Sequence, residues 1–161
     1  MNISIRVDHT INAPREAVFA FITNPENMTT FTGYGPVPGI KKALVISRPP
    51  NREHAGTVLL IENLDGTRHK EKVVLSETPR KLVHHIYDLP KPFSSLVREM
   101  EEEWELEVSG EERTAIIRQF HLSPTTPFAF PVAFFIASLI MKKAAKADLE
   151  NIAKKLKAEY T

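Results

Sequence analysis

An acidic run in the second half of the chain contains the first residues that could do chemistry. Glutamates occupy the odd positions of residues 101–107, and apolar residues occupy most of the even ones: Met100, Trp104, Leu106 and Val108. Successive side chains of a strand point to opposite faces, so the odd-numbered glutamates are expected to face water. Glu102 breaks the pattern because it falls on the apolar side. A carboxylate there needs a partner, water or a raised pKa, and it could transfer a proton.

The partner of Glu102 depends on the register of the following strand. A two- or four-residue turn around Gly110 would place Glu102 opposite Gln119, with His121 on the diagonal, and these three would form a polar cluster at one end of an apolar cavity. A one-residue bulge would reverse the parity and turn Arg118 inward as the partner of Glu102. In a third arrangement Glu102 lies at the rim with its carboxylate in solvent. We favour the third, since a perturbed or buried carboxylate is only a probabilistic marker of a site.

Histidines provide further candidates for proton transfer. His84 and His85 are neighbours on a predicted strand, so only one of them can enter a cavity; His85 shares its side with Tyr87. The candidate acids and bases are therefore Glu102, His121 and His85, with Tyr87 beside them. Neighbouring strand histidines cannot converge on one ion, and no ligand spacing is found at the remaining histidines His9, His54 and His69. We predict no metal site.

Other kinds of chemistry are excluded by what the sequence lacks. The chain has no cysteine, which rules out disulfides and thiolate catalysis. It has no glycine-rich phosphate loop, no nucleophile elbow and no paired-histidine helix motif. With 21 basic and 20 acidic side chains, the formal net charge of +1 creates no field that would attract nucleic acid. We therefore expect no cofactor and no nucleic-acid partner.

The elements that would position these residues follow from hydrophobic periodicity. Residues 3–8 alternate as a half-buried strand and contain no continuous apolar core, so they do not resemble a secretory signal and a cytoplasmic protein is expected. Pro14 opens a helix that ends at Asn24-Pro25, and a second short helix follows at residues 25–31. After a loop at residues 33–39, six further strands are predicted: Ile40–Ser47, Thr57–Leu64, Arg68–Ser76, Leu82–Leu89, Arg98–Val108 and Arg113–Leu122.

Short connections make these strands antiparallel neighbours, because a parallel pair needs a long crossover. Asp65-Gly66 is a strong hairpin signal. From Pro127 to Tyr160 apolar residues recur at steps of three and four, which predicts one long amphipathic helix. A chain of 161 residues with 42% hydrophobic residues fits a single α+β domain.

This order of elements resembles the helix-grip fold of the START and polyketide cyclase/dehydrase (SRPBCC) superfamily. Residues 11–19, INAPREAVF, are similar to its strand-to-helix opening, and residues 77–83, ETPRKLV, are similar to its turn into the next strand. The resemblance spans nearly the whole chain. It implies one START-like domain at residues 1–161, in which a curved antiparallel seven-stranded sheet wraps around a long C-terminal helix, with two short helices after the first strand.

The resemblance also implies a cavity between sheet and helix. Relatives bind lipids, hormones or polyketides, and some are cyclases or dehydratases. We expect the protein to bind or transport a hydrophobic small molecule, with a cyclase or dehydratase that uses a cavity acid or base as the alternative. The residues expected to contact the ligand are Phe21, Tyr87, Glu102, Trp104, Gln119, Phe134 and Met141.

The first half of the long helix carries more apolar residues than a sheet-facing stripe needs. Nine large ones fall within fourteen residues: Phe128, Phe130, Val132, Phe134, Phe135, Ile136, Leu139, Ile140 and Met141. They could cover a wide core together with a ligand, form a homodimer, or dock on a membrane surface with Lys142 and Lys143 near the headgroups. An interaction or membrane-docking module is thus the second alternative function. The stretch is too short for a transmembrane helix, which needs about 20 residues.

Overall fold

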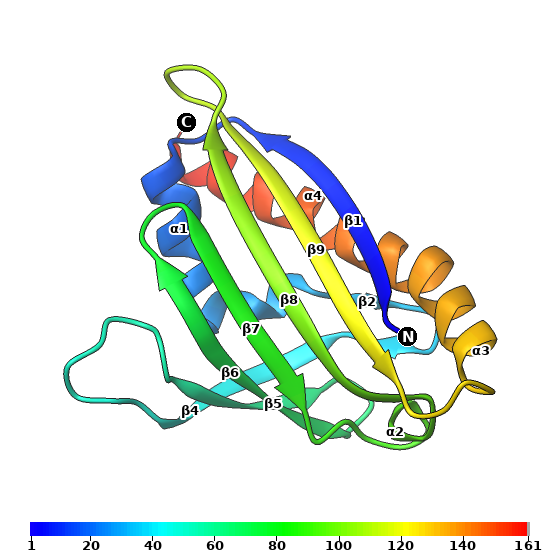
Figure 1. The fold of residues 1–161 in the computed structure, drawn as a ribbon. Coiled ribbons are helices and arrows are strands. Elements are labelled where there is room, and N and C mark those ends of the chain that lie inside the picture. The colour runs from blue at the N-terminus through cyan, green and yellow to red at the C-terminus, as the bar shows by residue number, and fades with distance from the viewer. Residues whose placement is uncertain (161) are drawn as a thin grey trace.

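The structure is a computed structural model that describes residues 1–160. Its main feature is a curved seven-stranded antiparallel sheet (Figure 1) in the order β1-β9-β8-β7-β6-β5-β4. The strands are β1 (Ile3–Ile11), β4 (Ile40–Ser47), β5 (Val58–Asn63), β6 (Arg68–Glu77), β7 (Lys81–Tyr87), β8 (Val97–Val108) and β9 (Thr114–Pro124). The six predicted strands and the N-terminal strand are therefore confirmed, with ends that shift by a few residues.

A long helical segment lies across one face of the sheet (Figure 1). It consists of α3 (Phe130–Phe135), a π-helical stretch η2 (Ile136–Met141) and α4 (Lys142–Tyr160). The predicted long helix is thus confirmed, although it begins at Phe130 and contains a wide turn in which Lys142 N–H donates to the Ala137 carbonyl. Two short helices follow β1, namely α1 (Arg15–Thr23) and the 3₁₀ helix η1 (Pro25–Thr30), also as predicted.

The core lies between the long helix and the helix-facing side of the sheet. On β1, Ile3, Ile5 and Val7 are buried while Ser4 and Arg6 are exposed, as the period-two pattern requires. On the helix the buried face includes Ala145, Leu149, Ile152 and Leu156, which recur at steps of three and four. The same periodicities that predict the elements therefore decide which faces meet.

The glycine-rich segment 33–39 is a small hairpin and not the irregular loop that its composition suggests. It pairs β2 (Gly33–Tyr34) with β3 (Val37–Pro38). Gly33 has φ +77°, and a Cβ atom there would lie 2.4 Å from the Val37 carbonyl oxygen. Only glycine fits this position. The one-turn helix α2 (Phe93–Leu96), which the sequence reading missed, leads into β8.

The connection between β8 and β9 determines which side chains face the helix. Val108 pairs with Thr114, so five residues separate the strands, an odd number that reverses the parity expected from a two- or four-residue turn. Glu102 consequently pairs with Phe120, and Trp104 pairs with Arg118. Arg118 therefore turns inward, which is the second of the registers considered from the sequence.

Candidate functional site

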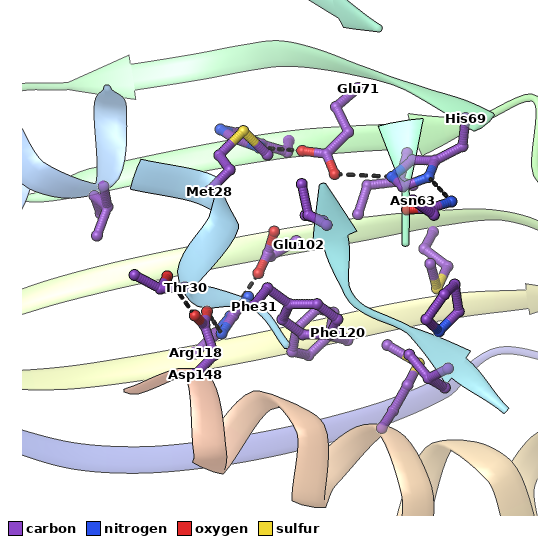
Figure 2. A pocket seen from close by; sticks show the side chains of 18 of the residues that line it. Met28, Thr30, Phe31, Asn63, His69, Glu71, Glu102, Arg118, Phe120 and Asp148 are labelled. Carbon is purple, nitrogen blue, oxygen red and sulfur yellow. Dashed lines mark hydrogen bonds and ion pairs between the residues drawn. The ribbon is translucent and has the colours of Figure 1, made fainter. Parts of the chain in front are cut away.

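A cavity of about 140 Å³ lies between the sheet, the long helix and η1. Most of its wall is apolar. Its aromatic lining comes from five residues: Phe21, Phe31, Phe93, Trp104 and Phe120. Polar side chains interrupt this lining in two clusters, which Figure 2 shows from close by. The cavity therefore has the composition of a ligand site, an apolar body with a few placed polar groups.

The first cluster, the arginine cluster, consists of Arg118, Glu102, Asp148 and Thr30. Arg118 Nε donates to Glu102 Oε1 at 2.5 Å, and its Nη1 donates to Asp148 Oδ2 at 2.7 Å. Thr30 Oγ1 donates to the other oxygen of Asp148 at 2.6 Å. All four residues are buried. A buried guanidinium held by two carboxylates fixes its neighbours firmly, since each charge would be costly without the others.

Aromatic rings surround the arginine as well. Its Cζ lies 4.1 Å from the centroid of the Trp104 ring and 5.0 Å from that of Phe120. The Phe31 ring is 5.8 Å away. Burial lowers the pKa of Arg118, but the charges and hydrogen bonds of Glu102 and Asp148 outweigh burial and raise it. The guanidinium is therefore a permanent cation in an aromatic environment.

The second cluster, the histidine cluster, consists of Glu71, His84, His69 and Asn63. His84 Nδ1 lies 2.9 Å from Glu71 Oε2, and His69 Nε2 lies 3.1 Å from Glu71 Oε1. Asn63 Nδ2 lies 3.2 Å from His69 Nδ1. An amide nitrogen only donates, so His69 accepts at Nδ1 and carries its proton at Nε2, from which it donates to Glu71. The carboxylate of Glu71 therefore orients both imidazoles.

Burial and hydrogen bonding shift two pKa values in this cluster. Burial raises the pKa of Glu71, but hydrogen bonds from His69 and His84 outweigh it and hold the pKa at about 2. Burial lowers the pKa of His84, but the hydrogen bond and charge of Glu71, with the charge of Glu102, outweigh it and raise the pKa. Glu71 is thus a stable anion, and His84 takes up a proton more readily than free histidine.

The two clusters meet at Glu102, which Figure 2 shows between them. His84 pairs with Glu102 across β7 and β8. Glu71, His84 and Glu102 each offer one donor atom, and these atoms lie within 4.8 Å of one another, so they are the residues that could hold a metal ion. All three already take part in hydrogen bonds, however, and the Arg118 guanidinium touches Glu102.

Chemically, the site combines an apolar pocket with groups able to hold or move a proton. His84 uses Nδ1 to bind Glu71, which leaves Nε2 for a ligand. A histidine oriented by a carboxylate in this way is a common general acid or base. Arg118 provides a fixed positive charge for an electron-rich group.

The structure places four of the predicted ligand-contacting residues on the cavity wall: Phe21, Glu102, Trp104 and Met141. Glu102 is only 5% exposed, so the expectation that its carboxylate lies at the rim in solvent is wrong. The reason is the odd connection between β8 and β9, which brings the Arg118 cation to it.

Gln119 and His121 lie on the opposite face of the sheet, since β9 has the reversed parity. His121 Nδ1 lies 2.8 Å from Ser4 Oγ, and Gln119 pairs with Arg6. Neither of them is among the cavity residues, so their predicted cluster with Glu102 does not form.

His85, Tyr87 and Phe134 also lie away from the cavity. His85 stacks on Tyr87 and pairs with Glu99 at 2.9 Å, because His84 and not His85 shares the inward face with Leu82 and Ile86. Phe134 is 51% exposed and stacks on Phe130.

Two buried carboxylates of the site, Glu71 and Asp148, were missed from the sequence, and His84 was considered but passed over in favour of His85. A signal existed for each carboxylate. Asp148 lies three residues after Ala145 and four before Ile152, which puts it beside the apolar stripe of the long helix. Glu71 shares its strand face with His69 and the buried Val73. Charged residues at core positions are expected to have partners, and these three pair with cavity residues.

The chain is similar to a known protein family along nearly its whole length. A family model described as polyketide cyclase / dehydrase and lipid transport matches residues 2–160. No curated protein matches the chain significantly.

Several solved structures share the fold at low identity. A norcoclaurine synthase mutant of Thalictrum flavum, in complex with a transition-state analogue, has a TM-score of 0.73 and 14% identity, covering 100% of this chain and 98% of that one. The Zhui aromatase/cyclase of Streptomyces sp. R1128 has a TM-score of 0.73 and 14% identity, covering 100% and 97%. Ara h 8.0201 has a TM-score of 0.73 and 11% identity, covering 98% and 99%. This likeness establishes the helix-grip fold, and the family match over nearly the whole chain shows that the protein belongs to the polyketide cyclase / dehydrase and lipid transport family.

Proposed function

We propose that this protein binds a small, mainly apolar molecule in the cavity between the sheet and the long helix. The observation that carries the proposal is the combination of an aromatic wall with two buried polar clusters, which orient a ligand without covering the apolar surface. Burying an apolar ligand surface would provide the driving force, at about 25 cal/mol per Å². The family description, which includes lipid transport, supports a binding role.

The size of the cavity restricts the ligand. Its volume of about 140 Å³ is below the roughly 300–1,000 Å³ of typical ligand pockets. An apolar cavity of about 150 Å³ accepts a molecule as large as benzene. We therefore propose a compact ligand, with one ring or a short chain, as the molecule that fits without rearrangement. A longer lipid or polyketide would require the cavity to open.

A cavity-filling variant tests this proposal. Met100 lines the cavity on β8, so Met100→Trp should occupy the space and abolish binding of ethylbenzene or 2-phenylethanol measured by calorimetry. Val108→Trp is the matched control, because Val108 lies on the same strand and is exposed. Equal binding by wild type and Met100→Trp, or no binding by wild type, would contradict the proposal.

A second candidate function is catalysis of cyclisation or dehydration. The observation that favours it is the His84–Glu71 pair on the cavity wall, in which His84 keeps Nε2 for proton transfer. Structural neighbours include an aromatase/cyclase and a norcoclaurine synthase. Turnover of small poly-β-ketones by wild type, and its loss in His84→Gln, would support this role; equal turnover in both would remove His84 from the mechanism.

The structure also has an exposed apolar surface outside the cavity. The start of the long helix and the residues just before it expose an apolar patch, with Phe128 92% exposed and further members at Val132, Phe134, Phe135 and Leu139. Lys142 and Lys143 follow it directly. None of the helices among residues 1–160 combines the length and apolar character needed to cross a membrane. We propose that this patch contacts an anionic membrane surface peripherally. The alternative is a homodimer formed through the same patch. We also propose that the protein is cytoplasmic.

A further inference from the structure

Carboxylates outnumber permanent cations on the cavity wall. Glu71, Glu102 and Asp148 provide three carboxylates, whereas Arg118 is the single permanent cation, and no lysine lines the cavity in the chain as described to residue 160. These four residues are 3–5% exposed. His69 also lines the cavity, but it is neutral because its Nδ1 accepts from Asn63. Even with His84 protonated, one negative charge therefore lacks a counterpart. An uncompensated buried charge is costly, so a positive ligand would be favoured here.

An available acceptor atom accompanies this surplus. Glu102 accepts from Arg118 at Oε1, whereas its Oε2 has no hydrogen-bond partner within residues 1–160. Glu102 is 5% exposed and lines the cavity. Oε2 is not one of the fully buried atoms that lack a partner, so it keeps accessible surface on the cavity wall, and it is the atom to which a ligand donor would bind. Its position between the arginine and histidine clusters (Figure 2) places that donor within the surplus negative field.

The rest of the wall suits an organic cation. The cavity is lined by five aromatic rings, and ring faces attract cations. The protein already holds one cation in this manner, since the Arg118 guanidinium packs over Trp104 at 4.1 Å between two carboxylates. An ammonium group attached to a compact apolar body would meet the same two kinds of partner.

A bare metal ion suits the site less well. Glu71 uses both carboxylate oxygens to hold histidines, and Glu102 is bound to the Arg118 cation. Coordination would break these hydrogen bonds and place a divalent cation beside a guanidinium. It would also leave the apolar space unfilled.

We infer that the cavity selects a small hydrophobic amine, whose ammonium group donates to Oε2 of Glu102 and whose apolar body contacts the aromatic wall. This inference rests on the proposed ligand-binding function and names the chemical class of the ligand.

Four probes of similar shape test it by calorimetry: 2-phenylethylamine, 2-phenylethanol, 3-phenylpropanoate and ethylbenzene. The amine should bind wild type at least roughly tenfold more tightly than the alcohol, as expected for a charge-assisted hydrogen bond in place of a neutral one. In Glu102→Gln this preference should disappear, while ethylbenzene binding is retained. Glu101→Gln is the matched control, because Glu101 is the exposed neighbour on the same strand and should keep the preference.

The outcomes separate the two proposals. Equal or tighter binding of the alcohol or the carboxylate would overturn the amine inference and leave the binding function standing. Failure of all four probes would overturn the binding function itself. Binding of Zn²⁺ or Mn²⁺ alone, without the amine, would overturn the inference in favour of a metal site. If Glu102→Gln does not fold, chemical-shift changes of the Met100 and Met141 methyl groups on adding the amine to wild type provide the readout; no change at these cavity residues would count against the inference.

Discussion

Nη1 of Arg118 on β9 lies 2.7 Å from Oδ2 of Asp148 on α4. This contact links the sheet to the long helix on the cavity wall, and Glu102 on β8 and Thr30 in η1 join the same network. The guanidinium connects β9 with β8 and α4, and Asp148 extends the network to η1, so four elements from distant parts of the chain are joined. The network both links elements of the fold and forms part of the cavity wall.

Removing the cation should destabilise the fold. Arg118→Leu would leave Glu102 and Asp148 buried without their partner, and breaking a buried pair in this way typically costs about 3–5 kcal/mol. Urea unfolding of both proteins measures the difference. Arg68→Gln is the control, since Arg68 forms an exposed pair with Glu62 and should change stability far less. If the free energy of unfolding fell equally in the two variants, the buried network would contribute no more to stability than the surface pair.

Acid should destabilise the protein through Glu71. The pKa of this group falls from 4.5 to about 2 on folding, so its stabilising contribution is present above 4.5 and is lost as pH falls toward about 2. The free energy of unfolding of wild type should therefore decrease across this range. In Glu71→Gln the decrease should be smaller. A variant with the same acid dependence as wild type would contradict the assignment.

His84 should have the opposite pH dependence. Its pKa is raised above 6.5 in the folded protein, so its contribution is complete below 6.5 and is lost as pH rises through the folded pKa. Thermal unfolding above neutral pH should show a decline in stability that His84→Gln lacks. Titration of the imidazole by NMR gives the pKa directly, and a value below 6.5 would refute the prediction.

The exposed apolar patch should mediate peripheral membrane contact. In flotation with vesicles of phosphatidylcholine and phosphatidylserine, the wild-type protein should bind. The double variant Phe128→Ser, Phe135→Ser should not bind, because the aromatic side chains are expected to enter the lipid interface. Val45→Ser with Leu64→Ser, which alters exposed apolar residues elsewhere, should leave binding unchanged. Absence of flotation together with a wild-type dimer that the patch variant dissociates would assign the patch to self-association.

Much of the fold could be predicted from local patterns. Alternation in β1 and the three-to-four spacing in the long helix each depend on a few consecutive residues, and the resemblance of residues 11–19 and 77–83 to a known family supplied the topology. The positions of Phe21, Trp104 and Met141 on the cavity wall followed from these patterns.

The polar part of the site depended on features that local patterns do not contain. A single residue in the β8–β9 connection decides whether Arg118 or Gln119 faces the helix, and the length of that loop is set by its own turn geometry. Both faces of β7 contain buried apolar residues, so the sequence pattern did not show which histidine points inward. His84 does, because it shares its strand face with Leu82 and Ile86. Asp148 meets Arg118 only after helix and sheet have packed.

Methyl NMR of the protein during titration with 2-phenylethanol shows directly whether a ligand enters the cavity. We expect saturable shift changes at the cavity residues Ile86, Met100, Met141 and Ile152, and no change at the surface methyl groups of Val108. If these four residues showed no saturable shift changes, or if such changes occurred instead on the exposed patch around Leu139, an internal ligand site would be contradicted.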